Sequence, residues 1–147
     1  MRCSLGYVWA LVSTLGVLGA GMGRAQPVSC ASRTGQNATL LLPAEAFQGL
    51  DIRPGDFLLA YTPEGRCAGK VRWEGHNAVL TLWADDPMTP DKEGFAIGDR
   101  LRLVRWRPGE RPLSLHLILA TERAYWISVD RYVPDGIYRV RHVVPDS

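Results

Sequence analysis

The sequence has few cysteines and no internal repeat or low-complexity linker, and each shortage excludes a class of protein. Three cysteines in 147 residues are too few for a miniprotein held together by several disulfides. Hydrophobic residues make up 46% and charged residues 22%, which is typical of globular chains and excludes collagen-like or disordered sequence. The length suits one domain and is too short for two sizeable cores.

The motifs of several enzyme classes are also missing. There is no Gly-x-Ser-x-Gly turn, no glycine-rich phosphate loop and no His-Glu-x-x-His pair. The three histidines, His76, His116 and His142, lie far apart in the sequence, and two of them sit among apolar strand residues. We therefore name no catalytic residue and expect a protein that is not an enzyme; a small extracellular hydrolase is the last-ranked alternative.

Residues 1–25 read as a secretory signal peptide, which leaves residues 26–147 as a single β-rich domain. Arg2 supplies the positive start, residues 8–18 form the apolar stretch, and Gly23-Arg24-Ala25 forms a small-x-small cleavage site that leaves Gln26 as the first mature residue. The apolar stretch is shorter than the about 20 residues that a membrane-spanning helix needs. We expect a secreted protein, extracellular or periplasmic, with no transmembrane segment after cleavage.

Cleavage changes both the charge balance and the cysteine count. Two of the 17 basic residues, Arg2 and Arg24, leave with the signal peptide, so the remaining 15 equal the 15 acidic residues. A near-zero net charge excludes a general nucleic-acid-binding surface, which needs a basic excess. Cys30 and Cys67 remain, and in an oxidising compartment they are expected to form a disulfide; two unpaired buried thiols are the alternative.

Short apolar segments between regularly spaced turn residues predict an all-β domain. The expected strands cover residues 38–42, 57–61, 67–73, 78–83, 100–106, 113–120, 125–129 and 137–143, and residues 44–47 suit one helical turn. Several strands alternate, with Lys70 and Arg72 opposite Val71 and Trp73. Such alternation indicates a sheet covered on one side. We predict a compact antiparallel sandwich or a partly open barrel of about seven or eight short strands.

The acidic segment 83–95 is a candidate calcium site. Its carboxylates are those of Asp85, Asp86, Asp91 and Glu93. Calcium takes six to eight hard oxygen ligands, and a proline-rich loop presents such oxygens well. The alternative is a solvated loop whose acidic side chains cap its own backbone amides. Apart from this possible calcium, the sequence points to no cofactor.

Tryptophan and arginine side chains are candidates for ligand binding. Exposed tryptophans on one sheet face stack against sugars, and guanidinium groups pair with carboxylate or sulfate. The candidate ligand-binding residues are Trp73, Trp83, Trp106, Arg102 and Arg105, and Trp126 is a further tryptophan of the mature chain. The alternatives are that the tryptophans fill the core and that the arginines form a solvated face.

Two segments resemble a β-rich module of secreted and cell-surface bacterial proteins. GDFLLAYTPEGRCAG at 55–69 is similar to the module's GDEIGVFTPDGLCVG, and VLTLWADDPMTPDKEGF at 79–95 is similar to its ITVWGDDPTTPEVDGF. Residues 98–106 resemble its closing strand, which ends in Trp. Glu93 stands where the module has Asp. The resemblance implies an extracellular role and no catalytic residue.

Together, these observations predict a secreted, non-catalytic binding or structural module whose partner is a protein or a polysaccharide. A carbohydrate-binding module that uses exposed Trp and Arg is the alternative function.

Overall fold

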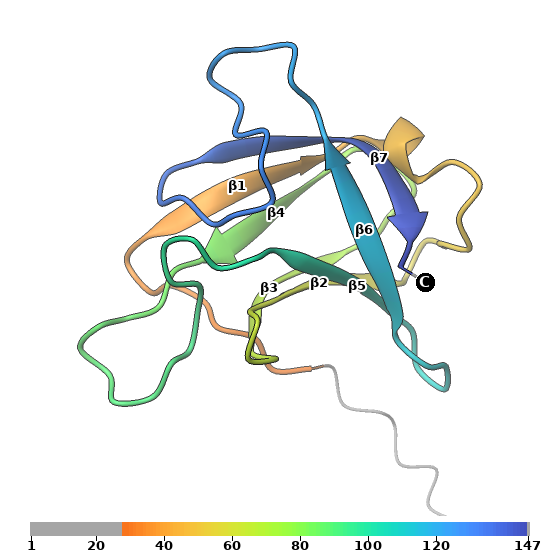
Figure 1. Ribbon diagram of the computed structural model, residues 1–147. Helices are drawn as coiled ribbons and strands as arrows, with labels where there is room; N and C mark the ends of the chain where they lie inside the picture. Colours follow the sequence, from red (N-terminus) through yellow and green to blue (C-terminus); the bar gives the residue numbers. More distant parts are fainter. Residues whose placement is uncertain (1–27, 147) are drawn as a thin grey trace, which may run out of the picture.

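The computed structural model describes residues 28–146 and shows an all-β domain (Figure 1). Positions 1–27 and 147 lie outside the described residues, and the predicted signal peptide at 1–25 lies outside them as well. The elements, in chain order, are β1 (Asn37–Leu42), the 3-10 helix η1 (Ala44–Phe47), β2 (Phe57–Tyr61), β3 (Cys67–Arg72), β4 (Ala78–Trp83), β5 (Arg102–Trp106), β6 (Leu113–Leu119) and β7 (Ile137–Pro145).

All seven strands belong to one continuous sheet with the order β3-β2-β5-β6-β7-β1-β4. Neighbouring strands are antiparallel except β1 and β7, which run parallel from the pair Thr39 and Ile137 to the pair Leu41 and Arg139. β7 follows β6 after a long connection and lies between β6 and β1 in the sheet (Figure 1). The sequence pattern does not predict this parallel pair, because local alternation carries no information about pairing direction.

The sheet curls until its two end strands, β3 and β4, come into contact, so the fold is a nearly closed barrel rather than a sandwich. Gly69 of β3 makes this approach possible. A Cβ atom at Gly69 would lie 2.4 Å from the carbonyl oxygen of Thr81 in β4, closer than a side chain tolerates. A larger residue at position 69 would therefore push the two end strands apart.

The inward-facing side chains fill the barrel with a single hydrophobic core. Leucines from β1, β2, β4 and β5 are almost completely buried there, as the alternation of these strands predicts. Phe95 and Tyr132 stack beside them with ring centroids 5.2 Å apart. Burial of this apolar area is the main term that stabilises the fold.

Two buried tyrosines in this region differ in how their hydroxyls are satisfied. The Tyr138 hydroxyl donates to the carbonyl oxygen of Arg131 at 2.5 Å and accepts from the backbone N–H of Val133 at 2.8 Å. The Tyr132 hydroxyl has no hydrogen-bond partner among residues 28–146, although the side chain is fully buried. Burial raises the pKa of Tyr132 to about 12, so the hydroxyl stays protonated.

We expect Tyr132→Phe to leave the free energy of unfolding unchanged or to raise it slightly, because it removes a buried polar group without breaking a hydrogen bond. Tyr138→Phe is the matched control, and it should cost about 1–3 kcal/mol because it leaves two backbone groups without their partner. Urea denaturation of both variants measures the difference. Equal losses in the two variants would show that a buried water holds the Tyr132 hydroxyl.

One predicted strand, 125–129, is not a strand in the structure. The segment lies in the long β6–β7 connection and makes a single bridge, from Trp126 to Ile137. Ile137 is the first residue of β7, so the segment lies beside the very end of that strand and cannot form further pairs with it. Likewise β5 begins at Arg102 rather than at residue 100, because Arg100 and Leu101 pair with the same connection at Arg131 and Asp130.

Candidate functional site

The outer face of β3, β2 and β5 gathers aromatic and basic side chains. Residues directly opposite each other in paired strands point to the same side of a sheet. The pairing therefore places Arg72, Phe57 and Trp106 in one row, Lys70, Leu59 and Val104 in the next, and Tyr61 beside Arg102 in the third. We call this surface the aromatic-basic face; it consists of Phe57, Leu59, Tyr61, Lys70, Arg72, Arg102, Val104 and Trp106.

The face has an apolar centre and a rim that reaches solvent. Leu59 and Val104 at its centre are buried but do not belong to the core inside the barrel. The aromatic side chains around them are half-buried, and the basic side chains are exposed. A ligand on this face would thus meet aromatic rings and cations together.

Phe57 and Trp106 form the aromatic part of the face. Their ring centroids are 5.9 Å apart with the planes inclined by 59°. The ammonium group of Lys70 lies 5.9 Å from the Phe57 ring centroid, within the range of a cation–π contact. The rings are fixed by neighbours from three strands, so little side-chain freedom would be lost on binding.

Arg102 and Tyr61 form the basic corner of the face. Arg102 is exposed, and no carboxylate of residues 28–146 lies within 4.0 Å of its guanidinium group. Burial raises the pKa of the Tyr61 hydroxyl above its ordinary value of 10.0, and the charge of Arg102 opposes this rise. Tyr61 therefore offers a protonated hydroxyl beside a cation at neutral pH.

A network of ion pairs at one end of the barrel holds Trp106 in place. Arg107 contacts Asp56 through Nε and Nη2, each 2.7 Å from a carboxylate oxygen, and it also reaches Asp51 and Glu110. Arg105, on the other side of Trp106 in the chain, binds Glu110 at 2.9 Å. Because both neighbours of Trp106 are anchored, the end of β5 presents this indole in a defined orientation.

The network changes the acidity of its members. Burial alone would raise the pKa of Asp56, but the hydrogen bonds from Arg107 and from the backbone of Arg53 bring it below its ordinary value. Hydrogen bonds from Arg107 likewise lower the pKa of Asp51 and of Glu110. The same contacts raise the pKa of Arg107, so the network is fully charged at neutral pH.

Two of the predicted ligand-binding residues are not available to a ligand. Trp73 is 3% exposed and packs in the core against Phe47, with ring centroids 4.7 Å apart. Arg105 is 5% exposed, and Glu110 occupies its guanidinium group. Both side chains lie on the inner side of the sheet: Trp73 shares the face of Val71, as the alternation predicts, and Arg105 lies opposite the core residue Leu58.

The other tryptophans lie on separate parts of the barrel. Trp83 is half-buried at the end of β4, opposite Asn37 of β1. Trp126 is half-buried in the β6–β7 connection, and the guanidinium carbon of Arg139 lies 5.5 Å from its ring centroid. Of the four tryptophans within residues 28–146, the structure therefore places only Trp106 on the aromatic-basic face, where it joins Arg102.

The acidic segment forms a closed loop after β4. Ala84 bridges Phe95 at the base of the loop, and Asp85 accepts hydrogen bonds from the backbone N–H groups of Glu93 at 2.7 Å and Gly94 at 3.4 Å. Asp86 accepts from the backbone N–H of Met88 at 2.9 Å. These are the backbone-capping contacts that the solvated-loop alternative predicts.

The remaining carboxylates of this loop, Asp91 and Glu93, are exposed. Within residues 28–146, no group of three or more His, Cys, Asp or Glu side chains is arranged to hold a metal ion. Lys92 extends from the loop between two acidic side chains, 2.7 Å from Glu64 and 2.6 Å from Asp99. Calcium binding by Asp85 and its neighbours therefore stays a prediction, to be tested together with ligand binding below.

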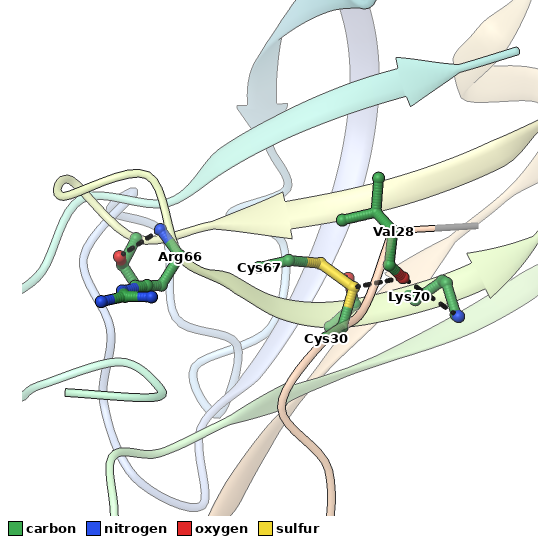
Figure 2. Close-up of a disulfide and its surroundings, with 7 residues drawn as sticks. Val28, Cys30, Arg66, Cys67 and Lys70 are labelled. Atoms are coloured by element: carbon green, nitrogen blue, oxygen red, sulfur yellow. Dashed lines mark hydrogen bonds between the residues drawn. A yellow bond between two sulfur atoms is a disulfide. The ribbon is translucent and has the colours of Figure 1, made fainter. Parts of the chain in front are cut away.

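The structure confirms the disulfide between Cys30 and Cys67, with an S–S distance of 2.05 Å and a Cα–Cα distance of 4.6 Å. Figure 2 shows how the bond fastens the segment before β1 to the start of β3. Two hydrogen bonds support it: Ala31 N–H donates to the Cys67 carbonyl oxygen, and the Lys70 ammonium group donates to the Val28 carbonyl oxygen at 3.3 Å.

Sequence reasoning missed Phe57, Tyr61, Lys70 and Arg72 as parts of one surface. Each lies in a correctly predicted strand, and the alternation of β3 already separated Lys70 and Arg72 from the core. Strand order was the missing information, because only the placement of β2 between β3 and β5 brings these side chains together.

No family model, curated protein or solved structure matches the chain. Within residues 28–146, the structure contains no helix whose length and apolar character would suffice to cross a membrane.

Proposed function

We propose that this protein is a secreted, non-catalytic binding module that holds an acidic polysaccharide on its aromatic-basic face. The observation that carries the proposal is the placement of Trp106 and Phe57 beside Lys70, Arg72 and Arg102 on one outer surface. Aromatic rings stack on the apolar faces of sugars, and cations attract the acidic groups of the chain.

The predicted compartment supports this proposal. A disulfide persists in oxidising surroundings outside the cytoplasm, where polysaccharides of cell walls and capsules are found. The signal peptide predicted at residues 1–25 and the resemblance to secreted bacterial modules point to the same compartment.

The rigid backing of the face supports a binding role further. Arg105 and Arg107 fix the end of β5 through their ion pairs, and β2 lies between two paired strands. Preorganised side chains lose less conformational entropy when a flexible polymer binds to them.

Retention on insoluble polysaccharides tests the proposal. The full chain, exported to an oxidising compartment and purified, is passed over acidic and neutral polysaccharides in calcium and in chelator. We expect retention on acidic polymers, and Trp106→Ala should weaken it about ten-fold or more because one of the stacking aromatic rings of the face is lost. Trp83→Ala is the matched control, since Trp83 is also half-buried but lies on β4.

Equal retention of the two variants would overturn the assignment of this face. Absence of retention on every polymer would overturn the proposal that the partner is a polysaccharide and would favour a protein partner. Retention in calcium alone, abolished by Asp85→Asn, would establish the acidic loop as a calcium site.

A further inference from the structure

A pocket at the basic corner of the aromatic-basic face has the size and chemistry of a site for one sugar ring. Its volume is about 240 Å³, below the about 300–1,000 Å³ of pockets that enclose drug-sized ligands. The pocket is lined by Tyr61, Gly65, Arg102, Val104, Pro112 and Ser114.

The lining divides into an apolar part and a polar part. Val104 and Pro112 offer aliphatic carbon to the C–H side of a ring. Tyr61 and Ser114 offer hydroxyl groups, each able to donate and accept a hydrogen bond. Gly65, in the turn between β2 and β3, has φ of 83° and no side chain to fill the space. The pocket thus combines an apolar surface and hydrogen-bonding groups, which together complement the C–H side and the hydroxyl groups of a pyranose ring.

The charge of the pocket is a single cation without a counter-ion among residues 28–146. Arg102 is the only charged residue in the lining. Glu64, next to Gly65 in the turn, is held by Lys92 at 2.7 Å and does not neutralise Arg102. A planar guanidinium group presents paired N–H donors that match the two oxygens of a carboxylate.

We propose that this pocket receives one carboxylated sugar unit, a uronic acid, with its carboxylate accepting hydrogen bonds from the Arg102 guanidinium group. The inference rests on the proposed function and specifies its ligand class. A neutral sugar would offer Arg102 only uncharged oxygen acceptors, whose hydrogen bonds are weaker than those of a carboxylate, so the pocket should discriminate against it.

The position of the pocket fits a chain that continues across the face. Arg102 and Trp106 lie four residues apart on β5, which corresponds to about 13 Å along an extended strand. A polymer with its acidic unit on Arg102 therefore reaches the Trp106 and Phe57 rings within a few units. Lys70 and Arg72 lie on β3, beyond the intervening strand β2, where further acidic units would meet them.

The test compares four soluble polymers by isothermal titration calorimetry with the full, disulfide-bonded chain: polygalacturonate, its methyl ester, dextran sulfate and dextran. We expect binding of polygalacturonate, and affinity about ten-fold or more lower for the methyl ester, because esterification removes the charged hydrogen-bond acceptor. Arg102→Gln should lose affinity for polygalacturonate to a similar extent. Arg100→Gln is the matched control; Arg100 is exposed and pairs with Asp130, so its loss should leave affinity unchanged.

The outcomes distinguish failure of the pocket assignment from failure of the proposed polysaccharide-binding function. Equal affinity for polygalacturonate and its ester, or equal loss in the two arginine variants, overturns the pocket while polysaccharide binding stands. Tighter binding of dextran sulfate, sensitive to Arg102→Gln, replaces the carboxylate by a sulfate and overturns the uronic acid assignment. No binding of any polymer overturns the proposed function as well.

Discussion

Replacing Asp56 by alanine is expected to lower the free energy of unfolding by about 3 kcal/mol, the lower end of the range for breaking a buried ion pair. Asp56 is 2% exposed and binds Arg107 through both carboxylate oxygens at 2.7 Å. It also accepts from the backbone N–H of Arg53 at 2.8 Å. The variant leaves that amide and part of a guanidinium group without partners at the end of the barrel.

Urea denaturation at pH 7 measures this loss, and Asp51→Ala is its control. Asp51 binds the same Arg107 but its side chain is 55% exposed, so its removal should cost much less than the removal of Asp56. If both variants lost the same stability, burial would not be what makes the Asp56 contact strong. A Trp106→Ala variant with wild-type stability would further show that the network, rather than the indole, holds this end of the barrel.

The same pair predicts how stability depends on pH. The pKa of Asp56 is lower in the folded protein than its ordinary value of 3.8, so the folded state favours the charged form. The stabilisation is therefore complete at pH values above 3.8 and is lost as the pH falls further, through the folded-state pKa. The difference between wild type and Asp56→Ala should shrink in that acidic range and stay constant near neutrality.

The elements of this fold follow from the sequence because each depends on neighbours in the chain. The segment Phe57–Tyr61 and the segment Ala78–Trp83 are strands with the bounds that their apolar character and flanking turns predict. The one-turn helix at Ala44–Phe47 follows Pro43 in the same way. These features need no knowledge of distant contacts.

Strand partners and sheet faces depend on distant contacts, and there prediction from sequence is weaker. Residues 125–129 have the apolar character of a strand, yet their neighbour β7 begins at Ile137 and allows one bridge. Trp73 and Trp106 both end or follow apolar strands, but one fills the core and the other faces outward. The disulfide could be predicted from the expectation that Cys3 leaves with a signal peptide, because Cys30 and Cys67 would then be the two remaining cysteines.

Removal of the disulfide by the double replacement Cys30→Ala and Cys67→Ala is expected to lower the free energy of unfolding by about 4 kcal/mol on the chain-entropy estimate. The bond closes a loop with a sequence separation of 37, which contains β1, η1 and β2. Without it, the unfolded chain gains the freedom of that whole segment. Alanine is used at both positions because it introduces no new polar group at the buried position 67.

The size of the loss distinguishes two roles for the bond. Besides the disulfide, the segment before β1 is held by the Thr34 hydroxyl, which donates to the Ala84 carbonyl oxygen, and by the Ala31 amide. If these contacts alone fixed the segment, the double variant and the reduced wild type would unfold within about 1 kcal/mol of the oxidised protein, contrary to the chain-entropy estimate. A common loss of several kcal/mol in both, with polysaccharide retention unchanged below the unfolding transition, would show that the bond stabilises the barrel by restricting the unfolded chain. The aromatic-basic face would then depend on its own ion pairs for its shape, as the contacts of Arg105 and Arg107 indicate.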